Sequence, residues 1–515
     1  MLKKIREMLK KDPGPEPDTG YIVGVSTGMP QDKPTPAGRI GDSMTKGVNF
    51  IELMIEHPVA MNKKEIDEII RIKERMGIEM SVHGSLDTYL TSPCDMDYKM
   101  AEQQLDLYID ITSKTKSKYV NFHASVLARP RMYSIPRRYD YLVDENGENI
   151  VRKITPSTPK LREWFFEDVD AAGKYRIEEK AEKKIIREVE ALKKKMDGGN
   201  MSAEDFEKRV NSMMEDTVRK MEDSYLEMFK RSLRDQPWPG DHGTEKIAYE
   251  FMGRWMSEVR DPLWIKYCGK KSYIDAKEED AIAAVAAKYV EGHMKKNMEK
   301  LQKRKVVITL ESPDARGGQY AGYYRLQTTE DIYKVVKHID SPNVRILVDF
   351  EHLATQGIDP EKDIDKCPSD VGEYVMALHV GTIPMPAHKH MPSPRGDVYI
   401  YKLVWKLRQK GFRKGIFIFE RGGLDPSMLY EQIIITLKDV AKYVSKGIPP
   451  EELPEEYFGL TKAEMEHEKR VVDSYMFEPL QGMLEMPELT DTWLGGEAIR
   501  KKQVRPDTWK KEEHR

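Results

Sequence analysis

The chain has 515 residues, of which 39% are hydrophobic and 33% are charged, a composition typical of a folded globular protein larger than one small domain. Its formal net charge is −3, so the overall charge does not indicate that the protein binds nucleic acid. Because no run of about 18 apolar residues occurs, we expect no membrane-spanning helix and no membrane partner.

The cysteines and the N-terminal segment bear on the cellular compartment. The three cysteines, Cys94, Cys268 and Cys367, show no C-x-x-C spacing, which favours a reducing cytoplasm and argues against a thiolate metal site. Residues 1–18 have the basic start of a signal peptide but lack its apolar core. We interpret them as an amphipathic, Pro-rich lead-in and expect a cytoplasmic protein.

Eight short apolar runs recur along the chain, at residues 21–26, 48–54, 78–84, 119–125, 306–312, 345–352, 374–381 and 415–423. Continuous apolar character, rather than alternation, is typical of parallel strands buried on both faces. Helical patterns lie between most of them, at residues 63–77, 98–114, 329–339, 397–411 and 427–447. The pattern predicts an α/β fold, a (β/α)8 TIM barrel. An open doubly wound sheet is the alternative, which the lack of GxGxxG after the first run disfavours.

The interval between the fourth and fifth runs is too long for a single βα connection. It is rich in Lys and Glu, and its pattern is strongly helical after a basic, aromatic start. We therefore predict a barrel domain of residues 19–126 and 305–447 and a mainly helical insertion of residues 127–304. The insertion would leave the barrel at the carboxyl end of strand four, the end where barrel enzymes have their active sites. Residues 448–515 form a C-terminal extension without evident chemistry.

Ionisable side chains stand at the ends of six consecutive predicted strands. In chain order they are His83, His123, Glu311, Asp349, His379 and Glu420, and His352 follows Asp349 by three residues. A single one is readily explained as a core histidine or a capping carboxylate. Six together are not, because each buried polar group without a partner costs stability. Imidazole and carboxylate ligands suit Zn²⁺ and Mn²⁺, so the pattern predicts a metal centre.

His388 and His390 form an H-x-H pair in the Pro-rich loop after strand seven. In extended backbone the two side chains point the same way, which suits two nitrogen ligands to one ion. An exposed histidine pair in a disordered loop is the alternative. The neighbouring His379 and His352 favour ligation.

Seven motifs carry a resemblance to a known family: VHGSLDTYLTSP, NFHAS, TLESPD, VDFEHLATQG, ALHVG, HKHMPSPRGD and FIFERG. Taken in this order, they resemble the endonuclease IV branch (AP endonuclease family 2) of the xylose isomerase-like TIM barrels. The resemblance covers roughly residues 20–125 and 305–445. It does not extend to the insertion or the C-terminal extension.

The resemblance implies a trinuclear zinc centre that cleaves DNA 5′ to abasic sites. The first ion would take His83, His123 and a bridging Glu311. The second would take Glu311, Asp349, His379 and Glu420, and the third would take His352, His388 and His390. The family has Asp where this chain has His388, so the third site carries one less negative charge. The short DNA-intercalating loops of the family are not recognisable in this chain.

With several metals, the expected chemistry is hydrolysis of a phosphodiester in nucleic acid, with Zn²⁺ as cofactor and Mn²⁺ or Mg²⁺ as alternatives. Glu311 and Glu420 are the catalytic candidates. Arg395 and Arg421 are candidate phosphate contacts, and Tyr320 is a candidate pocket residue. For each of these three residues, the structural alternative is an ion-pair or packing role.

Two further functions stay open. A sugar isomerase or epimerase of the same superfamily resembles this chain in using Glu311, Asp349, His379 and Glu420 around one Mn²⁺ or Mg²⁺ ion, with the two glutamates as acid and base. A non-enzymatic assembly protein that uses the helical insertion is the third possibility. The oligomeric state does not follow from the sequence.

Overall fold

The computed structural model describes residues 19–28, 35–86, 88–124, 142–153, 159–169, 171–232, 241–313, 325–381, 392–420 and 430–459. Eight parallel strands close into a barrel in chain order. They are β1 (Tyr21–Ser26), β2 (Phe50–Met54), β3 (Glu79–His83), β4 (Val120–His123), β5 (Ile308–Glu311), β6 (Val344–Asp349), β7 (Val375–His379) and β8 (Gly415–Phe419). The prediction of a (β/α)8 TIM barrel is confirmed.

Each strand coincides with an apolar run of the sequence to within one residue at its start or lies inside it, and most strand residues are buried. The prediction was wrong at one strand end: the run at residues 345–352 ends as a strand at Asp349, and helix α13 (Phe350–Thr355) follows at once. The Asp349 carboxylate accepts a hydrogen bond from the backbone N–H of His352 and so caps that helix. A capping aspartate ends the strand although the sequence stays largely apolar.

Helices follow most strands, as the βα pattern requires. They are α2 (Pro36–Met44), α3 (Lys63–Met76), α4 (Asp95–Lys114), α12 (Thr329–Ile339), α14 (Pro360–Lys366), α15 (Val371–Tyr374), α16 (Val398–Gln409), α17 (Tyr430–Ser445) and α18 (Glu455–Phe458). Short 3-10 turns occur at η1 (Pro58–Ala60) and η5 (Pro450–Glu452). The caps explain several starts: the side chains of Thr35, Thr328 and Asp397 each accept from a backbone N–H in the first turn of α2, α12 and α16.

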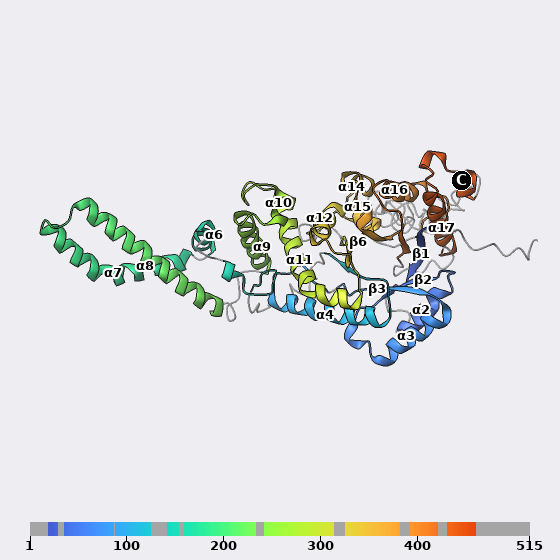
Figure 1. The fold of residues 1–515 in the computed structure, drawn as a ribbon, viewed down its shortest axis with the longest axis horizontal. Coiled ribbons are helices and arrows are strands. Elements are labelled where there is room, and N and C mark those ends of the chain that lie inside the picture. Colours follow the sequence, from blue (N-terminus) through green and yellow to red (C-terminus); the bar gives the residue numbers. More distant parts are fainter. Residues whose placement is uncertain are drawn as a thin grey trace, which may run out of the picture. The chain divides into compact units, whose positions relative to one another are not determined.

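The interval between β4 and β5 is mainly helical where the structure describes it; Leu142, Val143 and Asn149 instead take part in isolated antiparallel bridges. Its elements are η2 (Ile150–Lys153), α6 (Pro159–Trp164), the π-helix η3 (Phe165–Val169), α7 (Ala171–Asp197), α8 (Ala203–Ser232), α9 (Asp241–Glu258), α10 (Pro262–Cys268) and α11 (Glu278–Arg304). Helices α7 and α8 pack side by side as a long hairpin (Figure 1, green). Helix α11 packs on α4 and α12, where Glu291 contacts His338 of α12 at 2.8 Å.

The chain divides into two compact units. The first comprises Met1–Met54, Glu68–Met80 and Val348–Arg515, and the second comprises Ile55–Asp67 and Ser81–Leu347. All helices between β4 and β5 belong to the second unit. Among the described residues, no helix is both long and apolar enough to cross a membrane.

Candidate metal centres

The sequence-predicted ligands that the structure describes all lie at the carboxyl ends of barrel strands or directly after them, and all are buried. Two groups form, one in each compact unit. We name the first, His83, His123 and Glu311, the histidine-rich centre. We name the second, Asp349, His352, His379 and Glu420, the carboxylate-rich centre. His388 and His390 lie outside the described residues, so the expected third ligand set stays a prediction.

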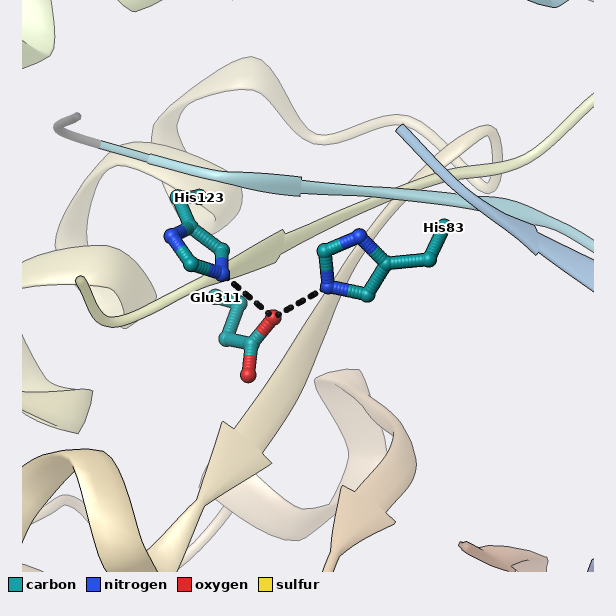
Figure 2. A group of neighbouring side chains, drawn as sticks. All are labelled: His83, His123 and Glu311. Atoms are coloured by element: carbon teal, nitrogen blue, oxygen red, sulfur yellow. Dashed lines mark ion pairs between the residues drawn. The ribbon is translucent and has the colours of Figure 1, made fainter. Parts of the chain in front are cut away.

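The histidine-rich centre brings two imidazoles to one carboxylate oxygen. The Nε2 atoms of His83 and His123 each lie 3.5 Å from Oε2 of Glu311, as Figure 2 shows. The two rings are edge to face, with centroids 5.5 Å apart. The ligand atoms of all three residues lie within 4.8 Å of one another. Three adjacent strands therefore present three donor atoms to one point.

The backbone fixes which nitrogen of His83 faces the centre. Its Nδ1 lies 2.9 Å from the carbonyl oxygen of Gly84, so Nδ1–H donates and the lone pair of the neutral ring stays at Nε2. This turn needs a glycine, because a Cβ at Gly84 would overlap the ring of Phe122. The fixed tautomer fits a ring that ligates a metal through Nε2.

Glu311 is held by a hydrogen-bond chain that runs through two buried polar residues of β4 and β5. Asn121, in register with Thr309, donates from Nδ2 to Oε2 of Glu311. The Thr309 hydroxyl in turn donates to Oδ1 of Asn121 at 2.8 Å, which sets the orientation of the amide. Both residues are fully buried. The carboxylate is thus positioned by a chain of hydrogen bonds from Thr309 through Asn121.

The carboxylate-rich centre gathers around His379. Its Nδ1 lies 3.2 Å from Oε2 of Glu420 and 3.5 Å from Oδ2 of Asp349. His352 follows in the first turn of α13, with Nε2 3.7 Å from Oδ2 of Asp349. Asp349, His352 and Glu420 each offer a ligand atom within 4.8 Å of the others. The sequence assigned His352 to a different ion, together with two histidines that the structure does not describe.

Glu52 is a site residue that the sequence reading missed. It lies in β2, is fully buried, and its Oε1 contacts Nε2 of His379 at 2.8 Å. The available signal was a carboxylate inside the apolar run FIELM. A strand buried on both faces has no solvent side for such a residue, so its side chain must have a buried partner.

The three predicted substrate contacts are only partly described. Arg395 lies beside α17, where its Nε is 3.7 Å from Oδ2 of Asp439. Burial raises the pKa of Asp439, and the positive charges of Arg395 and Lys442 offset this only in part. Arg421 and Tyr320 lie outside the described residues. Whether Arg395 contacts a phosphate stays a prediction.

Both donor sets fit divalent metal ions. Two neutral imidazoles and one carboxylate make the His₂Glu set of catalytic zinc, which leaves a position for water or substrate. The carboxylate-rich centre has two carboxylates and therefore a harder, more negative donor set, which also suits Mn²⁺ or Mg²⁺. In each centre, imidazole nitrogens face carboxylate oxygens at 3.2 to 3.7 Å, from the long end of the usual hydrogen-bond range to beyond it. A cation between them would satisfy both.

Comparison with known proteins relates part of the chain to a superfamily but not to a narrower family. Residues 275–439, less than half of the chain, match a family model described as a xylose isomerase-like TIM barrel. No curated protein matches the chain. Solved structures that resemble it include a D-tagatose 3-epimerase-like protein, with 13% identity and a TM-score of 0.44 over 83% of this chain and 99% of that one.

Two other solved structures are similarly distant. A 3-keto-D-glucoside 4-epimerase from E. coli has 10% identity and a TM-score of 0.40, over 83% of this chain and 99% of that one. A D-psicose 3-epimerase from Clostridium cellulolyticum H10 has 13% identity and a TM-score of 0.39, over 82% and 99%. Similarity at this level carries no information about the substrate. Neither the family description nor these three names singles out endonuclease IV.

Proposed function

We propose that the protein is a metal-dependent hydrolase that cleaves phosphodiester bonds, with nucleic acid as the substrate class. The observation that carries this proposal is the convergence of His83 Nε2 and His123 Nε2 on one oxygen of Glu311. A single-metal isomerase has no use for that histidine pair as ligands. A hydrolase with more than one ion does.

The residues themselves would do the positioning. His83 is locked in one tautomer by the Gly84 carbonyl, and Glu311 is locked by the amide of Asn121. A divalent ion held by His83, His123 and Glu311 would supply Lewis acidity and would make a water molecule more acidic. Burial of all three ligands keeps bulk water away from the donor atoms, so the charge of an ion held there would act on an anionic substrate with little screening.

The family resemblance adds two details to this proposal, one about the metal ligands and one about the substrate. Glu311 would also serve an ion of the carboxylate-rich centre, and His352 would join His388 and His390 around a third ion. Abasic-site DNA is the substrate that the endonuclease IV resemblance implies. The replacement of the family aspartate by His388 makes single-stranded DNA and RNA worth testing beside it.

The test begins with metal analysis of the purified protein and of the double variant His83→Ala/His123→Ala. We expect two or three equivalents in the wild-type protein and at least one fewer in the variant. Hydrolysis of bis(p-nitrophenyl) phosphate, then of abasic-site duplex, single-stranded DNA and RNA, follows with both proteins. Wild-type protein that binds several ions but cleaves no phosphodiester would refute the hydrolase.

A sugar isomerase or epimerase is the second candidate, and one comparison favours it. The segment that matches the xylose isomerase-like model, residues 275–439, contains Glu311, Asp349, His379 and Glu420, the set that serves a single ion. His83 and His123 precede that segment. On the family match alone this candidate ranks above the nuclease; the geometry of the histidine pair reverses the order.

The same double variant separates the two candidates. An isomerase would hold one equivalent of Mn²⁺ or Mg²⁺, and the variant would keep that ion and convert ketohexose probes such as D-tagatose and D-psicose. A hydrolase would lose both metal and activity in the variant. Wild-type protein without stoichiometric metal would contradict both candidates and support an assembly role for the helices between β4 and β5.

A further inference from the structure

Glu52 is an unusual residue for its position. Every residue of β2 is buried, and Glu52 has no exposed surface at all. A carboxylate in such a place is costly unless a partner compensates for the lost hydration. Its 2.8 Å contact with Nε2 of His379 supplies that partner. In the closed strand order, β8 and β1 lie between β7 and β2, so the contact reaches across the barrel interior.

This contact determines which His379 nitrogen can act as a ligand. A neutral imidazole has one N–H and one lone pair. With Nε2–H donating to Glu52, the lone pair is at Nδ1. Nδ1 is the atom that faces Glu420 at 3.2 Å and Asp349 at 3.5 Å. The lone pair is therefore directed to the point where the two carboxylate oxygens meet.

We infer that Glu52 is a positioning residue for His379. It holds the ring in the Nε2–H tautomer, fixes its rotation, and strengthens Nδ1 as a metal donor by withdrawing the proton on the opposite nitrogen. This inference rests on the proposed metal dependence and concerns the carboxylate-rich centre only. It adds a residue from β2 to a centre whose ligands come from β6, α13, β7 and the residue that follows β8.

A purely structural role would have different consequences. A buried Glu–His contact that only stabilises the barrel would affect unfolding and leave metal affinity unchanged. The chain contains a matched example: Glu291 contacts Nε2 of His338, also at 2.8 Å, between helices α11 and α12. Glu291 is equally buried but is not near a strand end. It provides the control for the effect of removing a buried carboxylate that contacts a histidine.

The experiment compares wild-type protein with Glu52→Gln, Glu52→Leu, His379→Ala and Glu291→Gln. Metal-free proteins are titrated with Co²⁺ in competition with a chelator, and the visible absorption of bound Co²⁺ is recorded. Glu52→Leu should weaken binding at one centre by about 10- to 100-fold and change the cobalt spectrum. Glu52→Gln keeps the hydrogen-bond acceptor without its charge, so its loss should be smaller. Glu291→Gln should bind like wild type.

The outcomes separate this inference from the proposed function. Wild-type protein that binds no metal contradicts the proposed function. Normal affinity and a normal spectrum in both Glu52 variants, while His379→Ala loses one ion, contradict the positioning role alone. Thermal unfolding of each metal-free variant shows whether the fold is intact. If Glu52→Leu does not fold, Glu52→Gln decides the question, with wild-type affinity and spectrum counting against the inference.

Discussion

Two buried glutamates in this molecule contact a histidine at the same distance but have different surroundings. Glu291, in the α11–α12 interface, also receives Lys288 at 2.9 Å and Lys295 at 2.6 Å. Glu52, at the barrel strands, contacts His379, whose other nitrogen faces two further carboxylates. The first set of charges is balanced by the protein's own cations. The second places one imidazole among three carboxylates, a donor set that a divalent cation would balance.

The pKa of Glu291 reflects this balance. Burial by itself would raise it, but hydrogen bonds and charge from Lys295 and Lys288 outweigh that effect and lower the pKa to about 2. Glu311 instead contacts the imidazoles of His83 and His123 and the side-chain amide of Asn121. We therefore expect substitutions at these glutamates and their partners to differ in their effects on metal affinity and on stability.

Replacing Glu311 should have the largest effect. Glu311→Gln removes the charge on which His83 and His123 converge, so we expect metal affinity at the histidine-rich centre to fall by about 100-fold or more. The metal-free protein should be no less stable than wild type, because Gln keeps the shape of the side chain and removes the cost of burying a charged group. Chelator competition and urea unfolding measure the two quantities. Lower stability of the metal-free variant together with unchanged metal binding would make Glu311 a structural residue like Glu291.

Glu291→Gln should lower the stability of the fold and leave metal affinity unchanged. Because the folded-state pKa is below the usual value, the ionised carboxylate stabilises the fold above about pH 4.5, and that contribution is lost as the pH falls toward about 2. We expect a loss of about 2–3 kcal/mol in unfolding free energy at pH 7 and a small difference near pH 2. Urea unfolding at several pH values measures it. Glu204→Gln, in the exposed pair with Lys208, is the control and should cost at most about 0.5 kcal/mol.

Thr309→Val tests the hydrogen-bond chain that positions Glu311 through Asn121. The substitution keeps the shape but leaves Oδ1 of Asn121 without the hydroxyl that donates to it, which should cost about 1–2 kcal/mol of unfolding free energy. Metal affinity should fall by about 10-fold, because Asn121 then holds Glu311 less firmly. Thr436→Val is the control, since that buried hydroxyl donates to the Gln432 carbonyl of its own helix. Equal metal affinity in both variants would show that Thr309 does not position the ligand.

The Arg395–Asp439 pair should give the smallest effect on stability. About a third of the Arg395 side chain is exposed, and Nε lies 3.7 Å from Asp439, so the pair should contribute less than about 1 kcal/mol. Burial raises the pKa of Asp439, so the ionised form disfavours the fold, and stability is lost as the pH rises through that pKa. Asp439→Asn should therefore be no less stable than wild type at pH 7. A clear loss at pH 7 would mean that the pair is stronger than its geometry indicates.

The sequence was sufficient to predict the barrel and the position of its polar strand ends. Eight apolar runs correspond to eight strands because parallel barrel strands are buried on both faces and cannot alternate. Ligands such as His83 and Glu420 are detectable because they interrupt or end such runs. Strand boundaries were less certain, as at β6, where the cap formed by Asp349 ends the strand inside an apolar segment.

The supporting residues were not predictable to the same degree. Glu52 and Asn121 lie inside the strands, where one polar residue looks like ordinary variation in a short run. Their roles depend on partners from other strands: His379 is in β7 and Glu311 in β5. Such pairings follow from the closure of the barrel, which no local pattern encodes. The grouping of His352 with Asp349 and Glu420 likewise became visible only with α13 in place.

Asp349 uses its two carboxylate oxygens for two different purposes. Oδ1 accepts from the backbone of His352 and starts helix α13, while Oδ2 faces the imidazole of His379. The local folding equilibrium of this helix and the occupancy of the carboxylate-rich centre are therefore thermodynamically linked. Whatever binds Oδ2 also restrains the residue that begins the helix, and amide hydrogen exchange in residues 350–355 would slow when the centre is filled.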